Sequence, residues 1–187
     1  WAETLPQEVK KEYLTTGYLG PFEGLYLYED GVCINGAGST LSSGIDLSRF
    51  VEAIMASYAD NVTTVSNSLQ QALNQSLTPL HYYNNSKQES GLAYAWFFDQ
   101  YGSDEGAIYS HLGGTVSYHS AAVFQPKQQT GIVAVSNCVP LLGGSGNNIY
   151  EMTFALGDKL MRMKDDSKEG FQNMMRERLR DNTIGLH

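Results

Sequence analysis

The sequence predicts an α+β fold in which an antiparallel sheet has helices packed on it. Three features lead to this prediction. Two helical patterns come first, a run of β-type segments joined by short turns follows, and a further helical pattern comes after the last β-type segment. With 187 residues, of which 42% are hydrophobic and 17% charged, the chain is long enough for one domain with its own core.

The first helical pattern has a clear beginning. Ser43 and Asp46 form an S-x-x-D capping box, in which side chains at the start of a helix satisfy free backbone N–H groups. Apolar residues follow at helical spacing, and we expect them to form one stripe. They are Leu47, Phe50, Val51 and Ile54.

Two more helical patterns lie at 62–77 and 148–163. In the first of them, apolar residues recur every four positions until Pro79 stops the pattern, because proline cannot continue the backbone hydrogen bonding of a helix. The second follows a glycine-rich linker. Its expected apolar stripe consists of Ile149, Met152, Phe154, Leu156 and Leu160.

The β-type segments are rich in aromatic and branched residues. Residues 22–34 are typical of a hairpin closed by the Asp30-Gly31 turn. Later strands are expected at 91–98, 107–110, 116–124 and 130–136, and a polar loop joins the last two. The predicted order is therefore helices, then an antiparallel meander, then a closing helix.

Charge narrows the range of partners. A net charge of −8 argues against a nucleic-acid-binding surface, and no apolar run reaches the length needed to cross a bilayer. Seven of the 12 basic residues fall in the last 29 positions. We therefore expect a main domain at 1–163 and an amphipathic tail helix at 164–187, whose charges form a solvated face.

The ends of the chain and the cysteines say little about location. Trp1 comes first, without an initiator methionine or a signal peptide, which suggests a processed protein or a segment of a longer one. Cys33 and Cys138 are the two cysteines, and the sequence does not show whether they pair. The compartment stays open, with a periplasmic or secreted location favoured.

One motif resembles a known family. Residues 109–120 read YSHLGGTVSYHS, which is similar to the His-x-Gly-Gly-Thr-x-Gly-Phe segment of class C β-lactamases, D-Ala-D-Ala peptidases and related esterases. In that family the segment replaces a K-T-G box on the strand lining the active site. Further landmarks of the family occur in its order at 36–50, 90–96 and 121–137. The resemblance implies the C-terminal part of the β-lactamase/transpeptidase-like fold.

Two elements of the family are missing. Its nucleophile lies in S-x-x-K, where serine attacks a carbonyl and lysine helps to remove the serine proton. None of the seven lysines has a serine three positions earlier. The family's Tyr-x-Asn or Ser-x-Asn element should precede residue 36, whereas the Tyr-x-Asn matches lie at 82–85. We expect both elements in the half of the fold that precedes residue 1.

The resemblance implies roles for four residues. His111 takes the position of a cation or hydrogen-bond donor facing the substrate carboxylate or the nucleophile's proton network, and histidine suits both roles near neutral pH. Gly113 and Gly114 let the backbone approach a bound carbonyl, and an N–H near Gly114 would complete the oxyanion hole. Thr115 would form a polar wall of the substrate pocket. A backbone-satisfied histidine and an ordinary strand threonine are the alternatives.

No cofactor or metal is expected. His119 lies eight positions after His111, so both could lie on one face of an unbroken strand. No carboxylate or cysteine completes a ligand set with them. Motifs for a nucleophile elbow, a zinc protease and a phosphate-binding loop are also missing from the sequence.

Two functions follow from these observations. The first is a partial serine hydrolase that, in the full-length protein, cleaves an amide or ester through an acyl-serine, with this segment supplying the K-T-G-equivalent strand and the oxyanion hole. The segment alone is then expected to be inactive. The second is a non-catalytic binding or assembly module. Leu112 and Ser117, which replace residues usual in the motif, favour it, and so does the additional basic tail helix expected at 164–187.

The expected partners follow from the same interpretation. They are a small-molecule or peptide substrate, together with either a second copy of the chain or the missing half of the fold. The sequence does not distinguish a β-lactam, a peptidoglycan peptide and a simple ester as substrate.

Overall fold

The computed structural model describes residues 15–19, 22–23, 40–58, 67–83, 89–100, 106–115, 117–139 and 149–161. Most of the hairpin expected at 22–34, the start of the helix expected at 62–77, and the tail helix expected at 164–187 lie outside these ranges. So does Cys33.

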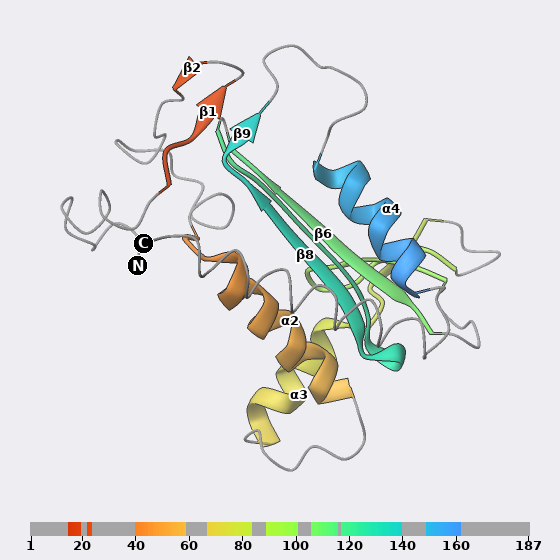
Figure 1. The fold of residues 1–187 in the computed structure, drawn as a ribbon. Helices are drawn as coiled ribbons and strands as arrows, with labels where there is room; N and C mark the ends of the chain where they lie inside the picture. The colour runs from red at the N-terminus through yellow and green to blue at the C-terminus, as the bar shows by residue number, and fades with distance from the viewer. Residues whose placement is uncertain are drawn as a thin grey trace.

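A six-stranded antiparallel sheet forms the centre of the described structure (Figure 1). Its strands lie side by side in sequence order. They are β3 (His81–Tyr82), β4 (Gly91–Leu92), β5 (Phe97–Asp99), β6 (Ile108–Gly114), β7 (His119–Gln125) and β8 (Thr130–Ser136). With helices packed on it, this sheet confirms the predicted α+β class.

The three long strands, β6, β7 and β8, have seven residues each and pair in one continuous register. His111 on β6 lies opposite Ala122 on β7, and Ala122 lies opposite Val133 on β8. A tight turn joins β6 to β7, and a 3-10 turn, η2 (Pro126–Gln128), joins β7 to β8. The expected strand at 130–136 is confirmed, while β6 runs four residues beyond the expected strand at 107–110 because its glycines weaken the β signal.

The strand expected at 91–98 was wrong, since the chain reverses direction within it. β4 and β5 pair antiparallel, and the N–H of Ala93 donates to the carbonyl of Trp96 at 2.8 Å to close the turn between them. Ala93 and Trp96, which close the turn, are buried at 0% and 7% exposure, while Tyr94 between them is 57% exposed. The four turn residues, 93–96, are alanine, tyrosine, alanine and tryptophan. The reversal therefore lacks the polar and glycine-rich composition that marks an ordinary turn.

The short strand β3 was not predicted, and a glycine on β4 makes its pairing possible. Tyr82 on β3 lies opposite Gly91 on β4. A Cβ atom at Gly91 would overlap the backbone carbonyl of His81. Only glycine allows the two backbones to approach this closely.

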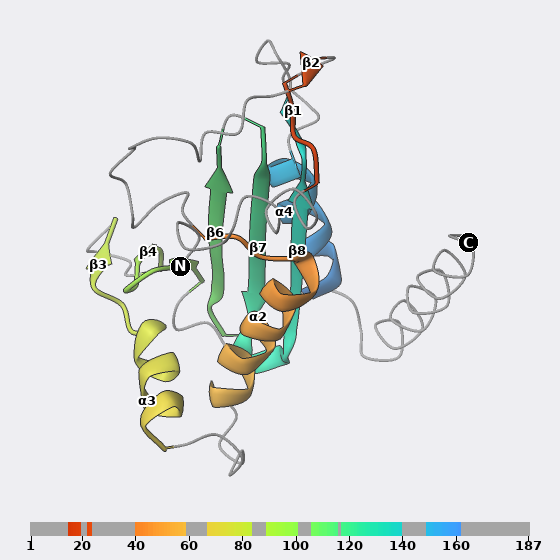
Figure 2. The ribbon, with the colours of Figure 1, turned by 90° about the vertical axis from the view of Figure 1, so that its left-hand side faces the viewer.

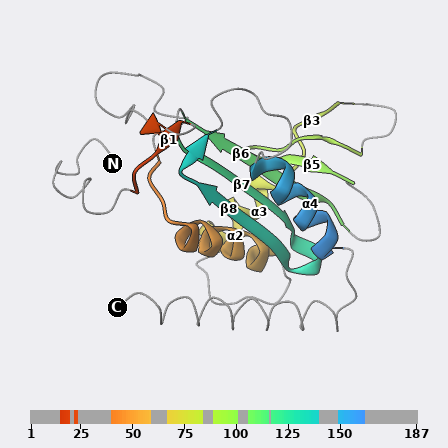
Figure 3. The same ribbon diagram turned by 45° about the horizontal axis from the view of Figure 1, so that its top comes forward.

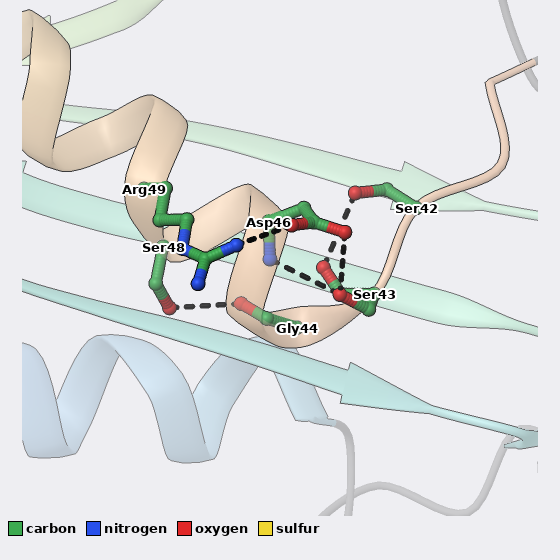
Figure 4. A network of polar contacts seen from close by, with 6 residues as sticks. All are labelled: Ser42, Ser43, Gly44, Asp46, Ser48 and Arg49. Atoms are coloured by element: carbon green, nitrogen blue, oxygen red, sulfur yellow. Dashed lines mark hydrogen bonds and ion pairs between the residues drawn. The ribbon is translucent and has the colours of Figure 1, made fainter.

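The helix α2 (Gly44–Tyr58) begins at the predicted capping box (Figure 4). The hydroxyl of Ser43 accepts a hydrogen bond from the N–H of Asp46 at 3.1 Å and donates to the carboxylate of Asp46 at 2.9 Å. The other carboxylate oxygen of Asp46 forms an exposed ion pair with Arg49 at 3.2 Å. These contacts satisfy one free N–H and place a negative charge in the first helical turn.

The buried face of α2 differs in part from the expected stripe. Val51 and Ile54 are buried as expected, at 2% and 0% exposure, and Met55 is buried beside them. Phe50 is 49% exposed, because the helical rotation of about 100° per residue turns it away from the sheet. The core under α2 includes Trp96, Phe98, Tyr109, Ala122 and Phe124.

The helix α3 (Asn67–Ser76) lies beside α2 (Figure 2). Its last turn leads to Leu77, which is 4% exposed and belongs to the same core. The hydroxyl of Tyr109 on β6 donates to the Leu77 carbonyl at 2.9 Å and so connects the end of this helix to the sheet.

The helix α4 (Ile149–Met161) covers the face of the sheet opposite α2, over β7 and β8 (Figures 2 and 3). Its buried residues are Thr153, Gly157 and Met161, at a spacing of four. A Cβ atom at Gly157 would lie only 3.2 Å from Val123 and 3.3 Å from Ile132. The missing side chain therefore lets the helix backbone lie close to the sheet.

The stripe expected for α4 was wrong at three positions. Met152, Phe154 and Leu156 are exposed, at 64%, 37% and 38%. The helix turns the face with Thr153 and Gly157 toward the sheet, because Gly157 permits a closer contact there than a large side chain would.

A small sheet with the order β2-β1-β9 lies at the end of β8 (Figure 1). Here β1 (Tyr18–Leu19) pairs antiparallel with β2 (Phe22–Glu23) and parallel with β9 (Cys138–Val139). The side chain of Asn137 donates to the carbonyl of Thr16 at 2.8 Å and strengthens this link. Segments more than a hundred residues apart in the sequence are thereby joined.

In the part of the chain that the structure describes, no helix has the length and apolar composition to cross a membrane.

We predict that Ser43→Ala lowers the free energy of unfolding by about 1 kcal/mol, because it removes the side-chain cap of α2. Urea denaturation followed by circular dichroism measures this change. Ser42→Ala is the matched control, since Ser42 is an exposed neighbour that does not cap the helix, and it should change stability by less than about 0.5 kcal/mol. Equal effects of the two substitutions would contradict the capping role.

Candidate functional site

The H-L-G-G-T segment, residues 111–115, lies at the end of β6 where pairing with β5 has stopped. On that side, β5 pairs only with residues 108–110 of β6. Among the described residues no strand pairs with β6 at 111–114 on the β5 side, and we call this stretch the open edge of β6. A substrate or another backbone can therefore approach the segment from this side.

The direction of the Gly114 N–H follows from the ladder between β6 and β7. The N–H of Thr115 donates to the carbonyl of Tyr118 at 2.8 Å, so these two residues form a hydrogen-bonded pair. Hydrogen-bonded and non-hydrogen-bonded pairs alternate in an antiparallel ladder. Gly114, which lies opposite His119, is therefore in a non-hydrogen-bonded pair, and its N–H points away from β7 toward the open edge.

His111 is exposed and held between two aromatic rings. The Phe97 ring stacks on it, with centroids 5.7 Å apart and planes at 26°, and the Trp96 ring meets it edge-on at 6.2 Å and 87°. These contacts fix the orientation of the imidazole next to the open edge. Whether His111 acts on a substrate or is an ordinary strand histidine stays a prediction.

A tyrosine and a histidine that sequence reasoning did not place in the site lie against the two glycines. The Tyr150 hydroxyl, from the first turn of α4, donates to the carbonyl of Gly113 at 2.9 Å. The Tyr150 ring stacks on His119, with centroids 4.9 Å apart and planes at 25°. The sequence offers His119 only as a candidate metal ligand, and no sequence motif includes Tyr150.

Neighbouring side chains leave no room for a Cβ atom at either glycine. A Cβ atom at Gly113 would overlap the Ser120 hydroxyl on β7. A Cβ atom at Gly114 would lie 2.8 Å from the Tyr150 hydroxyl oxygen and 3.3 Å from the His119 ring. Gly114 therefore makes room for Tyr150 on the face covered by α4, in addition to the role that the sequence predicted for it.

Thr115 lies in the turn that follows β6. Its side chain is half-buried, and its hydroxyl lies 3.5 Å from the carbonyl of Tyr118, the same carbonyl that accepts its backbone N–H. The residue thus helps to close the turn between β6 and β7. Its role as a wall of a substrate pocket stays a prediction.

Burial keeps the His119 and Tyr150 pair neutral. Desolvation lowers the pKa of His119 below its ordinary value, since it disfavours the charged imidazolium. Desolvation raises the pKa of the Tyr150 phenol, since it disfavours the phenolate. At neutral pH the phenol therefore keeps the proton that it donates to Gly113.

In the described ranges no group of three or more His, Cys, Asp or Glu side chains is placed to hold a metal ion. His111 and His119 lie at different places on the two strands, since His111 is opposite Ala122 and His119 is opposite Gly114.

Comparison with known families agrees with the fold. A family model described as Beta-lactamase matches residues 2–155. The chain belongs to the β-lactamase family. The match includes the H-L-G-G-T segment, the six-stranded sheet and the first half of α4. The resemblance inferred from the sequence is thereby confirmed, and the α+β architecture is that of the serine β-lactamase and penicillin-binding type. No curated protein matches the chain.

We predict that the thermal stability of this β-lactamase-family chain falls as the pH decreases through the range just below 6.5, in part because of His119. The folded-state pKa of His119 lies below its unfolded-state value, so the unfolded chain binds more protons in this range. Stability is therefore full above about pH 6.5 and is lost as the pH falls.

Melting temperatures of the natural chain and of His119→Phe, measured between pH 7.5 and 5.5, test this. Phenylalanine keeps an aromatic ring next to Tyr150 and removes the titrating group. The natural chain should lose more stability over this range than the variant. Parallel curves would show that another group causes the pH dependence.

Proposed function

We propose that this chain supplies the substrate-lining strand and one oxyanion donor of a serine hydrolase that cleaves an amide or ester through an acyl-serine. The observation that carries the proposal is the direction of the Gly114 N–H, which points to the open edge of β6 beside an exposed, oriented His111. The family match supports the hydrolase-type fold. The nucleophile would come from residues outside this sequence, because no S-x-x-K occurs in it.

The Gly114 N–H would stabilise the negative charge that develops on the substrate carbonyl oxygen. A backbone donor on a long, paired strand is held in place before the reaction, so little free energy is spent on orienting it. The second donor would be the N–H of the nucleophilic serine. Removing one such donor typically slows acylation about 100-fold to 1,000-fold.

His111 would act on protons or on a substrate carboxylate at the same edge. The residue is exposed, and its ring stacks on Phe97 and meets Trp96 edge-on, which restricts its orientation. A correctly oriented imidazole can relay the proton of a nucleophile or bind a carboxylate when charged. The substrate class stays open among a β-lactam, a peptidoglycan peptide and a simple ester.

A non-catalytic binding or assembly module is the second candidate. Leu112 favours it, because a half-buried apolar side chain stands where the family motif has a small or hydroxyl residue. The missing S-x-x-K favours it equally if no upstream segment supplies that motif. In this case the open edge of β6 would bind a ligand without reacting with it.

The partners we propose are the rest of the fold or a second copy of the chain. Val135 on β8 is 53% exposed, and Met152 and Leu156 on α4 are 64% and 38% exposed. Within the described residues no strand pairs with the outer edge of β8. An unpaired strand edge and exposed apolar side chains each favour association with another chain.

Intact-mass measurement after incubation with a penicillin and with a reactive phosphonate tests the function. We predict no adduct on this 187-residue chain. A longer natural protein with an upstream S-x-x-K should gain one adduct on that serine, and His111→Ala should slow its formation about 100-fold.

Two results would overturn the proposal. A stoichiometric adduct on a serine within this chain would place the nucleophile inside it. No adduct on a longer protein that has S-x-x-K would favour the binding module.

A further inference from the structure

We propose that Tyr150 is a positioning residue that holds the Gly113–Gly114 peptide group, and with it the Gly114 N–H, in the direction needed at the open edge. The effect of Tyr150 on catalysis rests on the proposed hydrolase function, whereas its effect on the backbone does not. The observation behind it is the hydrogen bond from the Tyr150 hydroxyl to the Gly113 carbonyl at 2.9 Å.

The carbonyl that Tyr150 contacts and the N–H of Gly114 belong to one peptide group. This group is planar, so its C=O and N–H point in opposite directions and turn together. A donor that fixes the Gly113 carbonyl therefore fixes the Gly114 N–H as well. By the alternation of the ladder, the same carbonyl also faces β7 in a hydrogen-bonded pair with Ser120.

Two consecutive glycines make such a restraint important. Glycine populates backbone conformations that other residues avoid, and a pair of them at the end of a strand is the least restrained part of that strand. Beyond Ser110, no pairing with β5 holds β6 from its other side. The ladder with β7 holds the Gly113 carbonyl from one side, and Tyr150 on α4 adds a second hydrogen bond to the same oxygen where β5 gives no support.

The hydrogen bond from Tyr150 to the Gly113 carbonyl also polarises the Gly114 N–H. A hydrogen bond to the carbonyl of a peptide group strengthens the hydrogen bonds that its N–H donates, by roughly 10–30%. The Gly114 N–H is therefore a better donor to a developing oxyanion when the Tyr150 hydroxyl is bonded on the other side of the peptide group.

His119 and the absence of a side chain at Gly114 complete the arrangement. The His119 ring, opposite Gly114, stacks on Tyr150 at 4.9 Å and limits its motion. Space for the hydroxyl exists only because residue 114 is glycine, since a Cβ atom would lie 2.8 Å from it. Gly114→Ala should therefore displace the Tyr150 hydroxyl and weaken the same hydrogen bond.

The first test uses the 187-residue chain and does not require it to be catalytically active. Backbone NMR relaxation should give an order parameter near 0.85 for the Gly114 N–H in the natural chain and a value falling toward 0.6 in Tyr150→Phe. The Leu112 N–H, on the same edge of β6, is the internal reference and should not change. Tyr58→Phe, at an exposed tyrosine of α2, is the matched control variant.

The second test uses a longer natural protein that forms the serine adduct. Tyr150→Phe should lower kcat about tenfold and leave KM unchanged, because the lost hydrogen bond acts on the oxyanion donor and not on substrate binding. The double variant Tyr150→Phe/Gly114→Ala should lower kcat no more than the more damaging single substitution does, since both substitutions remove the same hydrogen bond.

The outcomes separate this inference from the proposed function. An unchanged Gly114 order parameter in Tyr150→Phe would overturn the positioning role, whatever the activity. A reduced order parameter, together with no adduct on any natural form of the protein, would support the restraint and overturn the hydrolase. A reduced order parameter with an unchanged kcat would overturn the catalytic consequence.

Discussion

The hydrogen-bond ladder between β6 and β7 is the constraint on which the candidate site depends, because its alternation decides where each backbone group points. The pair of Thr115 and Tyr118 closes the ladder, and this places the Gly114 N–H on the side away from β7. A shift of one residue in the register would direct that N–H into the sheet. The seven-residue length of β6 and β7 holds the register in place.

The helices α2 and α4, which cover opposite faces of the sheet, pack on it in different ways. α2 contributes Val51, Ile54 and Met55 to the apolar core that it shares with residues of the sheet such as Phe124. α4 lies close to the opposite face through Gly157, and this approach brings Tyr150 to the Gly113 carbonyl. A bulkier residue at 157 would move the helix outward and lengthen the contact at 150, although the two positions lie about two turns apart.

Much of the fold could be predicted because its signals are local. The capping box of Ser43 and Asp46, the hairpin from β7 to β8, and the H-L-G-G-T segment each depend on residues close together in the sequence. The segments that were predicted wrongly carry no such local signal. The turn between β4 and β5 contains no glycine, proline, asparagine or aspartate, and the buried face of α4 is chosen by a glycine contact with the sheet rather than by helical periodicity.

The sequence by itself therefore determined the α+β class, the start of α2, the family motif with His111 and the two glycines, and the lack of an S-x-x-K. The tertiary structure alone decided the parallel pairing of β1 with β9, the orientation of His111 between two aromatic rings, and the contact of Tyr150 with Gly113. The last contact joins residues 37 positions apart. No local pattern encodes such a contact, because it forms only when α4 packs on the completed sheet.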